Sequence, residues 1–235
     1  MKTVIIGDTH GRTLWKSIVE VENPDRVIFV GDYFDTHEDV SGAGQMMVFQ
    51  EIIDYKKSQD PGKIIMLIGN HDHHYFPEVG YTGTSGYQSG AAVAIGFLIS
   101  ENKEHLQMAY QFDNILCTHA GVGKTFLEAQ GWKDGEDISG FLNDLWKYKP
   151  KAFCFTGFNP YGDDMGQTPI WIRPKSLMKD AQDFKKDVIQ VVGHTSQNKI
   201  DIKGKSTGGR YFFIDTLGTS GEYLIIEGDN ITCKS

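Results

Sequence analysis

The stretch that decides the fold is Thr3-Val4-Ile5-Ile6-Gly7-Asp8-Thr9-His10-Gly11, which joins an apolar run to two polar side chains. The run is rich in β-branched residues, which favour a buried strand. Asp8 and His10 project to the same side of the chain if the strand continues through residue 9, because side chains alternate along a strand. The opening of the chain therefore predicts a strand that delivers a carboxylate and an imidazole to one place.

Four further motifs have the same design, because each one ends an apolar run. They are Gly31-Asp32-Tyr33-Phe34-Asp35, Gly69-Asn70-His71-Asp72, Thr118-His119-Ala120-Gly121 and Gly193-His194-Thr195. Open α/β sheets build their sites where buried strands give way to loops. A single Asp-x-His would carry little weight, but five such motifs in order predict one functional site.

The spacing of apolar residues predicts alternating strands and helices in the first half and a β meander in the last third. Expected strands are 3–7, 26–30, 63–68, 106–112, 115–118, 188–192, 199–202, 211–215, 223–227 and 230–233. Expected helices are 13–20, 45–57, 91–100, 123–130 and 138–147, and residues 155–168 are expected to form a surface loop. We find no repeat or linker, so we predict a single domain over residues 1–235, built as a sheet sandwich flanked by helices.

Composition narrows the possible partners and location. The net charge is −8 and we find no basic stripe, so binding to long nucleic acid is not expected. No apolar run approaches the roughly 20 residues that span a bilayer, so no membrane partner is expected. The first motif follows the N-terminus almost at once, and the three cysteines are unpaired in spacing. Both features favour a cytoplasmic protein with reduced thiols.

The polar residues of the motifs are suited to divalent cations. Carboxylate and carbonyl oxygens suit hard ions, and imidazole suits Mn, Fe, Zn and Ni. The candidate ligands are Asp8, His10, Asp32, Asn70, His119 and His194. Asp32 follows a strand and a glycine, so its carboxylate is free to bridge two ions. Two divalent ions about 3.5–4 Å apart can clamp a phosphoryl group and activate a water as nucleophile. Mixed oxygen and nitrogen ligation favours Mn²⁺, with Fe and Zn as alternatives.

These motifs resemble those of the calcineurin-like metallophosphoesterases, over nearly the whole chain. The likeness is greatest to the small bacterial and bacteriophage Ser/Thr-type phosphoprotein phosphatases. It rests on Gly7-Asp8-Thr9-His10-Gly11, on Pro169-Ile170-Trp171-Ile172-Arg173, and on Val192-Gly193-His194-Thr195 followed by Phe213-Ile214-Asp215-Thr216. The resemblance implies an α/β fold, a four-layer α/β/β/α metallophosphoesterase sandwich. It also implies that Asp32 bridges the ions, that His71 is the general acid oriented by Asp35, and that Arg173 binds phosphate.

The chain departs from the pattern of the phosphoprotein phosphatases at two arginines. Asp35 is followed by Thr36 where the family carries arginine, and Ile68 occupies the position of the arginine before the GNH motif. A bidentate guanidinium is the strongest side-chain grip on a phosphate. Residues His37, His73 and His74 are candidates to fill this gap.

We therefore predict an enzyme, a metal-dependent phosphoesterase that hydrolyses phosphomonoesters, including phosphoproteins. The alternative is hydrolysis of a nucleotide, a dinucleoside polyphosphate or a phosphodiester at the same site, because Tyr75, Tyr81 and Tyr87 would suit a base. A non-catalytic scaffold is disfavoured because all six candidate ligands and His71 are present.

Overall fold

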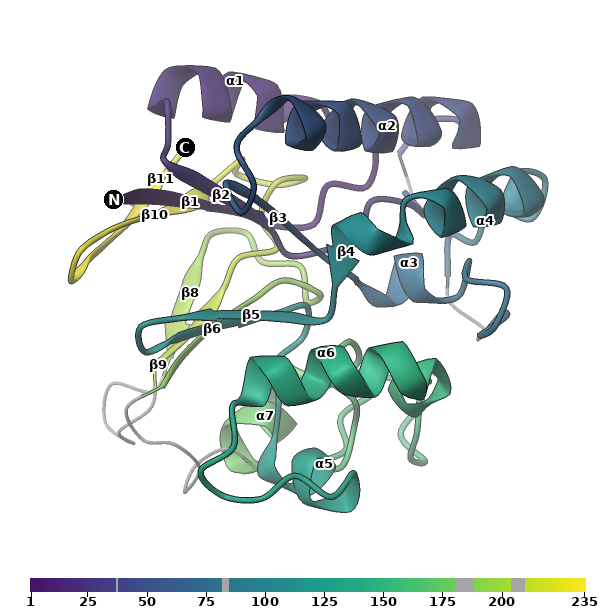
Figure 1. Ribbon diagram of the computed structural model, residues 1–235, viewed down its shortest axis with the longest axis vertical. Helices are drawn as coiled ribbons and strands as arrows, with labels where there is room; N and C mark the ends of the chain where they lie inside the picture. The colour runs from purple at the N-terminus through teal and green to yellow at the C-terminus, as the bar shows by residue number, and fades with distance from the viewer. Residues whose placement is uncertain (37, 82–84, 181–187, 204–209) are drawn as a thin grey trace.

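The computed structural model describes residues 1–36, 38–81, 85–180, 188–203 and 210–235. Its central feature is a pair of sheets stacked face to face, with helices on both outer faces (Figure 1). This arrangement confirms the predicted four-layer α/β/β/α sandwich. Within the described residues, none of the helices is long and apolar enough to cross a bilayer.

The first sheet contains six strands in the order β11-β10-β1-β2-β3-β4. Strands β1 (Lys2–Ile6), β2 (Arg26–Phe29), β3 (Ile64–Leu67) and β4 (Leu106–Gln107) run parallel. Strand β10 (Tyr223–Glu227) pairs antiparallel with β1, and β11 (Asn230–Lys234) completes the C-terminal hairpin. The first strand of the chain therefore lies in the middle of its sheet.

The second sheet contains five strands in the order β5-β6-β7-β9-β8. Strands β5 (Ala109–Phe112) and β6 (Ile115–Thr118) form a hairpin. Strands β6, β7 (Ile189–Val192) and β9 (Arg210–Phe213) are parallel, and β8 (Asp201–Lys203) pairs antiparallel with β9.

Helices cover both sheets from outside (Figure 1). On the side of the first sheet lie α1 (Leu14–Glu22), α2 (Gly42–Ser58) and α4 (Ala92–Glu101), and on the side of the second lie α5 (Lys124–Ala129), α6 (Ile138–Tyr148) and α7 (Pro174–Asp180). Short turns of helix, namely α3 (Asn70–His73), η1 (Lys103–His105) and η2 (Pro150–Phe153), lie between them. Residues 155–168 form neither helix nor strand, as predicted.

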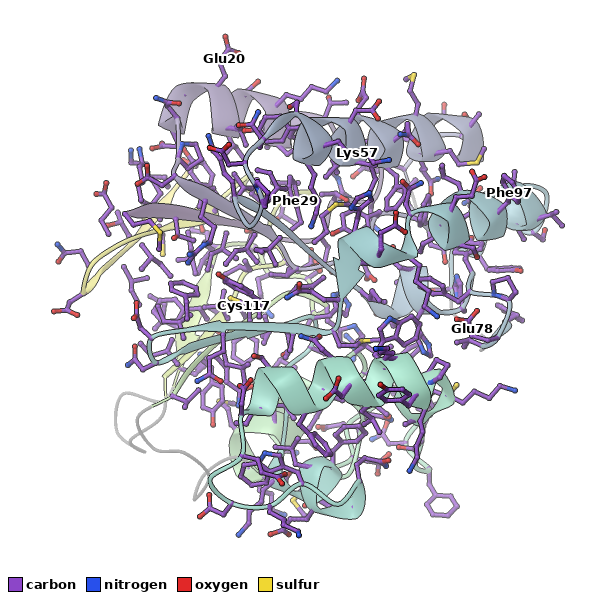
Figure 2. All side chains as sticks on the ribbon, viewed as in Figure 1. Glu20, Phe29, Lys57, Glu78, Phe97 and Cys117 are labelled. Atoms are coloured by element: carbon purple, nitrogen blue, oxygen red, sulfur yellow. The ribbon has the colours of Figure 1, made fainter. Side chains whose placement is uncertain are left out.

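Side chains on the two faces of the central strands belong to two separate clusters of the hydrophobic core. Ile5 and Ile28 pack between the sheets with Cys117, whereas Val4 and Phe29 belong to the cluster that includes the helices. Figure 2 shows Phe29 and Cys117 inside the molecule and Phe97 at its surface. Strands buried on both faces must be apolar at successive positions, which explains their unbroken hydrophobic runs.

One prediction of secondary structure is wrong. Residues 106–112 were expected to form one strand, but the chain passes from the first sheet to the second at Met108. Asn143 of α6 accepts the backbone N–H groups of Met108 and Ala109 at 2.9 and 3.1 Å, and so satisfies the donors at the crossing. The apolar pattern continues through Met108, so it does not reveal the change of sheet.

Candidate metal and catalytic site

The five motifs lie at the carboxyl ends of parallel strands from both sheets. Asp8 follows β1, Asp32 follows β2, Asn70 follows β3, His119 follows β6 and His194 follows β7. The carboxyl ends of parallel strands meet along one edge of a sheet, which brings side chains from distant parts of the sequence together. The six candidate ligands are therefore collected in one place, as the sequence predicted.

The candidate ligands form two groups that share one carboxylate. One potential ligand atom from each of Asp8, His10 and Asp32 lies within 4.8 Å of the others, and the same holds for Asp32, His119 and His194. Asp32 is 2% exposed, so its carboxylate is almost removed from bulk water. Each of the two groups could hold a metal ion, and Asp32 belongs to both.

Asn70 completes the second group. Its Oδ1 lies 2.9 Å from Nε2 of His119 and 2.9 Å from Nδ1 of His194. The Nε2 atom of His119 is also 3.3 Å from Oδ2 of Asp32. Four potential ligand atoms from four strand ends thus lie close together.

Backbone carbonyls fix the tautomers of the three imidazoles. The carbonyl of Phe34 lies 2.6 Å from Nδ1 of His10, and that of Val30 lies 2.9 Å from Nδ1 of His119. Nε2 of His194 lies 3.1 Å from the carbonyl of Trp171. A carbonyl can only accept a hydrogen bond, so the second nitrogen of each neutral ring carries a lone pair.

These lone pairs make the site suited to a cation. The bare nitrogens of His119 and His194, Oδ1 of Asn70 and Oδ2 of Asp32 are all acceptors, and none has a hydrogen to share. Acceptors held about 3 Å apart repel one another unless a positive ion lies between them. The residues present therefore fit divalent metal ions, and the carbonyls that orient the rings form the outer support that such ligands need.

Electrostatics support the same interpretation. Burial, together with the charges of Asp215 and Asp32, raises the pKa of Asp8 well above its usual range. Burial lowers the pKa of His10 to about 4, and burial together with the charge of Arg173 lowers the pKa of His194 well below its usual range. Uncharged imidazoles beside crowded carboxylates are what a cation site requires before it is loaded.

Several site residues have strained backbones. Positive φ angles occur at His10 (45°), Asp32 (53°), Asp35 (63°) and His194 (66°). A left-handed conformation is costly for a residue other than glycine, and such strain concentrates at functional sites. The surrounding fold therefore imposes these conformations in order to aim the side chains.

The motif glycines make room for neighbouring carboxylates. A Cβ atom at Gly69 would overlap Oδ1 of Asp32, and one at Gly193 would overlap Oδ1 of Asp8. The glycine of each of these two motifs thus clears space for an acid that belongs to another motif.

Asp72 is an important residue whose role the sequence did not reveal. Its carboxylate accepts the backbone N–H groups of Asp32, Tyr33 and Gly69 at 2.8, 2.7 and 2.8 Å. It is fully buried, and it ties the loop after β2 to the loop after β3. Its position in the Gly69–Asp72 motif was the available signal. Asp215 was quoted in a family motif but was given no role; it is 9% exposed and its charge acts on Asp8.

His71 lies beside the candidate ligands and contacts Asp35. Nδ1 of His71 is 3.0 Å from Oδ2 of Asp35, and the rings of His71 and His10 are 5.5 Å apart. Burial lowers the pKa of His71, but the carboxylates of Asp32 and Asp35 outweigh burial, so the pKa is raised overall. The pair has the geometry expected of an acid and the carboxylate that orients it.

Arg173 approaches the site from the segment that follows residues 155–168. Its guanidinium donates to the carbonyls of Tyr161 and His194 at 2.8 and 3.3 Å and to Oγ1 of Thr195 at 3.1 Å. Burial lowers its pKa, whereas the charges of Asp32, Asp215 and Asp8 oppose that change. Arg173 is therefore close enough to the candidate ligands to feel their charge.

The structure contradicts one predicted substrate residue. His73 is fully buried, its Nε2 lies 2.9 Å from the carbonyl of Pro150, and its ring packs against Trp146 and Phe153. It points away from the candidate ligands because it lies on the opposite side of α3 from His71. His74 is also buried and contacts Asp35. His37 lies outside the described residues.

Comparisons with known proteins agree with this geometry. The profile of the calcineurin-like phosphoesterases matches residues 1–213. A cold-active protein tyrosine phosphatase superposes with a TM-score of 0.68 at 17% identity, covering 99% of this chain and 75% of that chain. The cold-active protein-tyrosine phosphatase of the psychrophile Shewanella sp. gives a TM-score of 0.65 at 17% identity, over 99% and 77% of the two chains.

A more distant fold relative is a protein serine/threonine phosphatase from Saccharomyces cerevisiae with similarity to human phosphatase PP5. It superposes with a TM-score of 0.58 at 14% identity, covering 100% of this chain and 79% of that one. At such identities the likeness demonstrates a common fold. A comparison with curated protein sequences found no match. The profile match and the two-sheet sandwich together place the chain in the calcineurin-like phosphoesterase family of metal-dependent phosphoester hydrolases.

Proposed function

We propose that this enzyme is a phosphomonoesterase with a dinuclear metal site. The observation that carries the proposal is the sharing of Asp32 between two groups of convergent ligand atoms. Asp8 and His10 would hold one ion, and Asn70, His119 and His194 the other, with Asp32 between them. Mn²⁺ suits this mixed set of oxygen and nitrogen donors best, and Fe or Zn could replace it. Two such ions, when bound, supply Lewis-acid activation of water and neutralise charge on the phosphoryl group.

The chain itself supplies proton transfer to the leaving group. In its charged form His71 donates from Nε2, because Asp35 holds Nδ1 at 3.0 Å. Asp35 thus orients the ring and favours the imidazolium. General acid catalysis matters most for leaving groups that are poor without a proton, such as alkoxides. This property favours esters of serine, threonine or other alcohols as substrates.

Arg173 is proposed to bind the phosphoryl group. It is the single arginine that matches the phosphate-binding positions of the family, and its neighbours Tyr161 and Thr195 fix its direction. A guanidinium beside a loaded metal site stabilises charge on the phosphoryl oxygens as that charge builds up.

The arrangement of Tyr75, Tyr81 and Tyr87 does not favour the alternative of a nucleotide substrate. Tyr75 is 4% exposed, and its hydroxyl is bonded to Asp35, so it is not free to stack on a base. Its ring stacks instead on Tyr87, with centroids 5.2 Å apart. Only Tyr81 of the three is well exposed, which leaves no stacking platform of the expected kind.

The experiment is a substrate panel on protein reconstituted with Mn²⁺. It should contain a phosphoserine peptide, a phosphotyrosine peptide, a nitrophenyl monoester, a nitrophenyl diester, a nucleotide and a dinucleoside polyphosphate. The proposal expects monoesters to exceed the diester and the dinucleotide in kcat/KM. His71→Asn should slow the phosphoserine peptide by about 10²–10⁴-fold and the nitrophenyl monoester much less. The matched control is His105→Asn, in η1, which should behave as the parent. A preference for the diester would reject the monoesterase proposal.

A further inference from the structure

Asp35 contacts two other side chains besides that of His71, the residue that it is proposed to orient. Its Oδ2 accepts from Nδ1 of His71 at 3.0 Å and also lies 2.8 Å from Nε2 of His74, an ion-pair contact. Its Oδ1 accepts a hydrogen bond from the hydroxyl of Tyr75. Its backbone N–H donates to Oε1 of Gln45 at 2.8 Å, which fixes the main chain at the same residue. The carboxylate is therefore held at both oxygens.

The short helix α3 explains how two histidines reach one oxygen. Residues three apart lie on the same face of a helix, so His71 and His74 point together, while His73 points the other way. Asp35 has a φ of 63°, a strained conformation that presents its carboxylate to this face. The sequence His71–Tyr75 thus places three polar side chains around one acid.

The direction of the hydrogen bonds follows from the charge of Asp35. Burial favours the neutral acid, but the hydrogen bonds from His71, His74 and Tyr75 outweigh burial and lower the pKa of Asp35. An ionised carboxylate can only accept hydrogen bonds, so Nδ1 of His71 and the hydroxyl of Tyr75 must donate. His71 consequently carries a proton on Nδ1, and its Nε2 is left for the reacting group.

His74 and Tyr75 are themselves immobilised. His74 is 2% exposed, and its ring lies 4.4 Å from that of Tyr75 and 5.0 Å from that of Tyr87. The hydroxyl of Tyr75 accepts the backbone N–H of Gln88 at 2.9 Å, and its ring packs on Phe34 at 5.6 Å. Their rotamers are locked by packing, as a support for a catalytic group requires.

We propose that His74 and Tyr75 are positioning residues, which clamp the two oxygens of Asp35 so that His71 points its Nε2 at the leaving group. This inference rests on the proposed function of His71 as the general acid. With the single bond to His71 alone, the carboxylate could rotate about its Cβ–Cγ bond and the imidazole would turn with it. The hydrogen bond from Tyr75 to Oδ1 and the contact of His74 with Oδ2 remove that rotation.

The test compares two esters in each variant. Tyr75→Phe removes a hydroxyl but keeps the packed ring, and His74→Phe removes the nitrogen that contacts Oδ2. Each variant should lower kcat on the phosphoserine peptide by about three- to tenfold, the range of one hydrogen bond. On the nitrophenyl monoester, whose leaving group needs little protonation, the change should be less than about twofold. KM should stay within about twofold, because neither residue is proposed to bind the substrate.

A conservative variant separates positioning from packing. His74→Gln retains an N–H donor at nearly the same reach, so it should recover most of the activity that His74→Phe loses. His73→Gln is the matched control, since it alters the neighbouring buried imidazole, whose partner is Pro150. It should lower stability without changing the ratio of the two esters. Tyr55→Phe, on α2, controls for loss of a hydroxyl elsewhere.

A measurement without turnover completes the test. In the metal-free protein, at a pH where the His71 ring is neutral, ¹⁵N NMR of the histidine rings should find His71 as the single Nδ1–H tautomer. The Nδ1 proton should exchange with solvent faster in Tyr75→Phe and in His74→Phe, while Tyr55→Phe leaves its exchange unchanged. This readout also applies if one of the variants proves too unstable for kinetics.

The outcomes distinguish the two proposals. If His71→Asn shows the selective loss on the phosphoserine peptide but Tyr75→Phe and His74→Phe slow both esters equally, the positioning proposal is overturned and the function stands. If His71→Asn slows both esters equally, the acid role fails, and the positioning proposal fails with it. Selective loss in all three variants, with faster exchange at His71, supports both.

Discussion

The carboxylate of Asp72 accepts the backbone N–H of Asp32 at 2.8 Å, while the carboxylate of Asp32 accepts the backbone N–H of His71 at 2.9 Å. The loop after β2 and the loop after β3 therefore exchange carboxylate-to-amide hydrogen bonds. The exchange holds Asp32 at its positive φ of 53° and aims its side chain between the two ligand groups.

Removing Asp72 should damage both stability and metal binding. Asp72→Ala leaves three buried N–H groups without an acceptor, and each buried unsatisfied group costs about 1–3 kcal/mol. We expect the free energy of unfolding of the metal-free protein to fall by at least about 3 kcal/mol. The affinity for Mn²⁺ should fall as well, because Asp32 loses its fixed direction. Urea unfolding and calorimetric metal titration measure the two effects.

The matched control for this variant is Asp137→Ala. Asp137 is the N-cap of α6, and its carboxylate also accepts two backbone N–H groups, from Ser139 and Gly140. Its loss should cost about 1 kcal/mol of stability with no change in metal affinity. Unchanged metal affinity in Asp72→Ala would mean that Asp32 does not depend on this hydrogen bond.

The sequence identifies the candidate ligands because each of these polar side chains follows a glycine or a threonine at the end of an apolar run. It did not reveal the direction of His73, because a four-residue helix such as α3 has no periodic apolar signal. His73 and His74 are neighbours in sequence, yet one contacts Pro150 and the other Asp35. The passage between sheets at Met108 was hidden for a similar reason, since both sheets demand the same apolar residues.

The two ligand groups predict the metal content. Protein reconstituted with Mn²⁺ should hold about two ions per chain by elemental analysis after desalting, the number that two ligand groups sharing a bridging carboxylate would bind. Asp32→Asn should lose at least one of these ions, because the shared carboxylate loses its charge. It should also lose nearly all turnover. Asp229→Asn, in the exposed hairpin turn between β10 and β11, is the control. Full activity and full metal content in Asp32→Asn would reject the dinuclear arrangement.

A separate prediction concerns stability at the end of the first sheet that lies opposite the candidate ligands. Glu22 accepts hydrogen bonds from Lys2 at 2.5 Å, from the hydroxyl of Tyr223 at 2.7 Å and from Lys234 at 3.1 Å. The hydrogen bond from Lys2 is the largest of several influences that lower the pKa of Glu22 to about 2. One carboxylate thereby joins the first strand to both strands of the C-terminal hairpin.

Glu22→Gln should therefore lower the free energy of unfolding at pH 7, by about 1–3 kcal/mol for hydrogen bonds to a charged group. The pKa of Glu22 is lower in the folded than in the unfolded state, so its stabilising effect is complete above about pH 4.5. The effect is lost as the pH falls toward 2. The difference between parent and variant, measured by urea unfolding, should shrink over that window. A difference that stays constant down to pH 2.5 would show that the charge of Glu22 is not what stabilises the hairpin.

The last prediction concerns Arg173, which we expect to carry most of the side-chain recognition of phosphate. Thr36 and Ile68 occupy positions where related phosphatases carry arginine, so no arginine at those positions shares phosphate binding with Arg173. A hydrogen bond to a charged group is worth about 1.5–3 kcal/mol, so Arg173→Ala should lower kcat/KM by about ten- to a hundredfold on a monoester. Arg173→Lys should recover only part of this loss, because an ammonium cannot reproduce the fork of a guanidinium. Lys175→Ala, an exposed cation two residues further on, should match the parent.

Metal content should stay unchanged in Arg173→Ala, although Arg173 donates to the carbonyl of His194 at 3.3 Å. The ring of His194 is oriented independently, by the carbonyl of Trp171 at 3.1 Å, and its backbone N–H donates to Asp8 at 2.9 Å. Elemental analysis alongside steady-state kinetics therefore separates substrate binding from support of the metal site. Loss of an ion in Arg173→Ala would make Arg173 a support for His194. Parent-like kinetics on a monoester would show that the phosphoryl group is held without it.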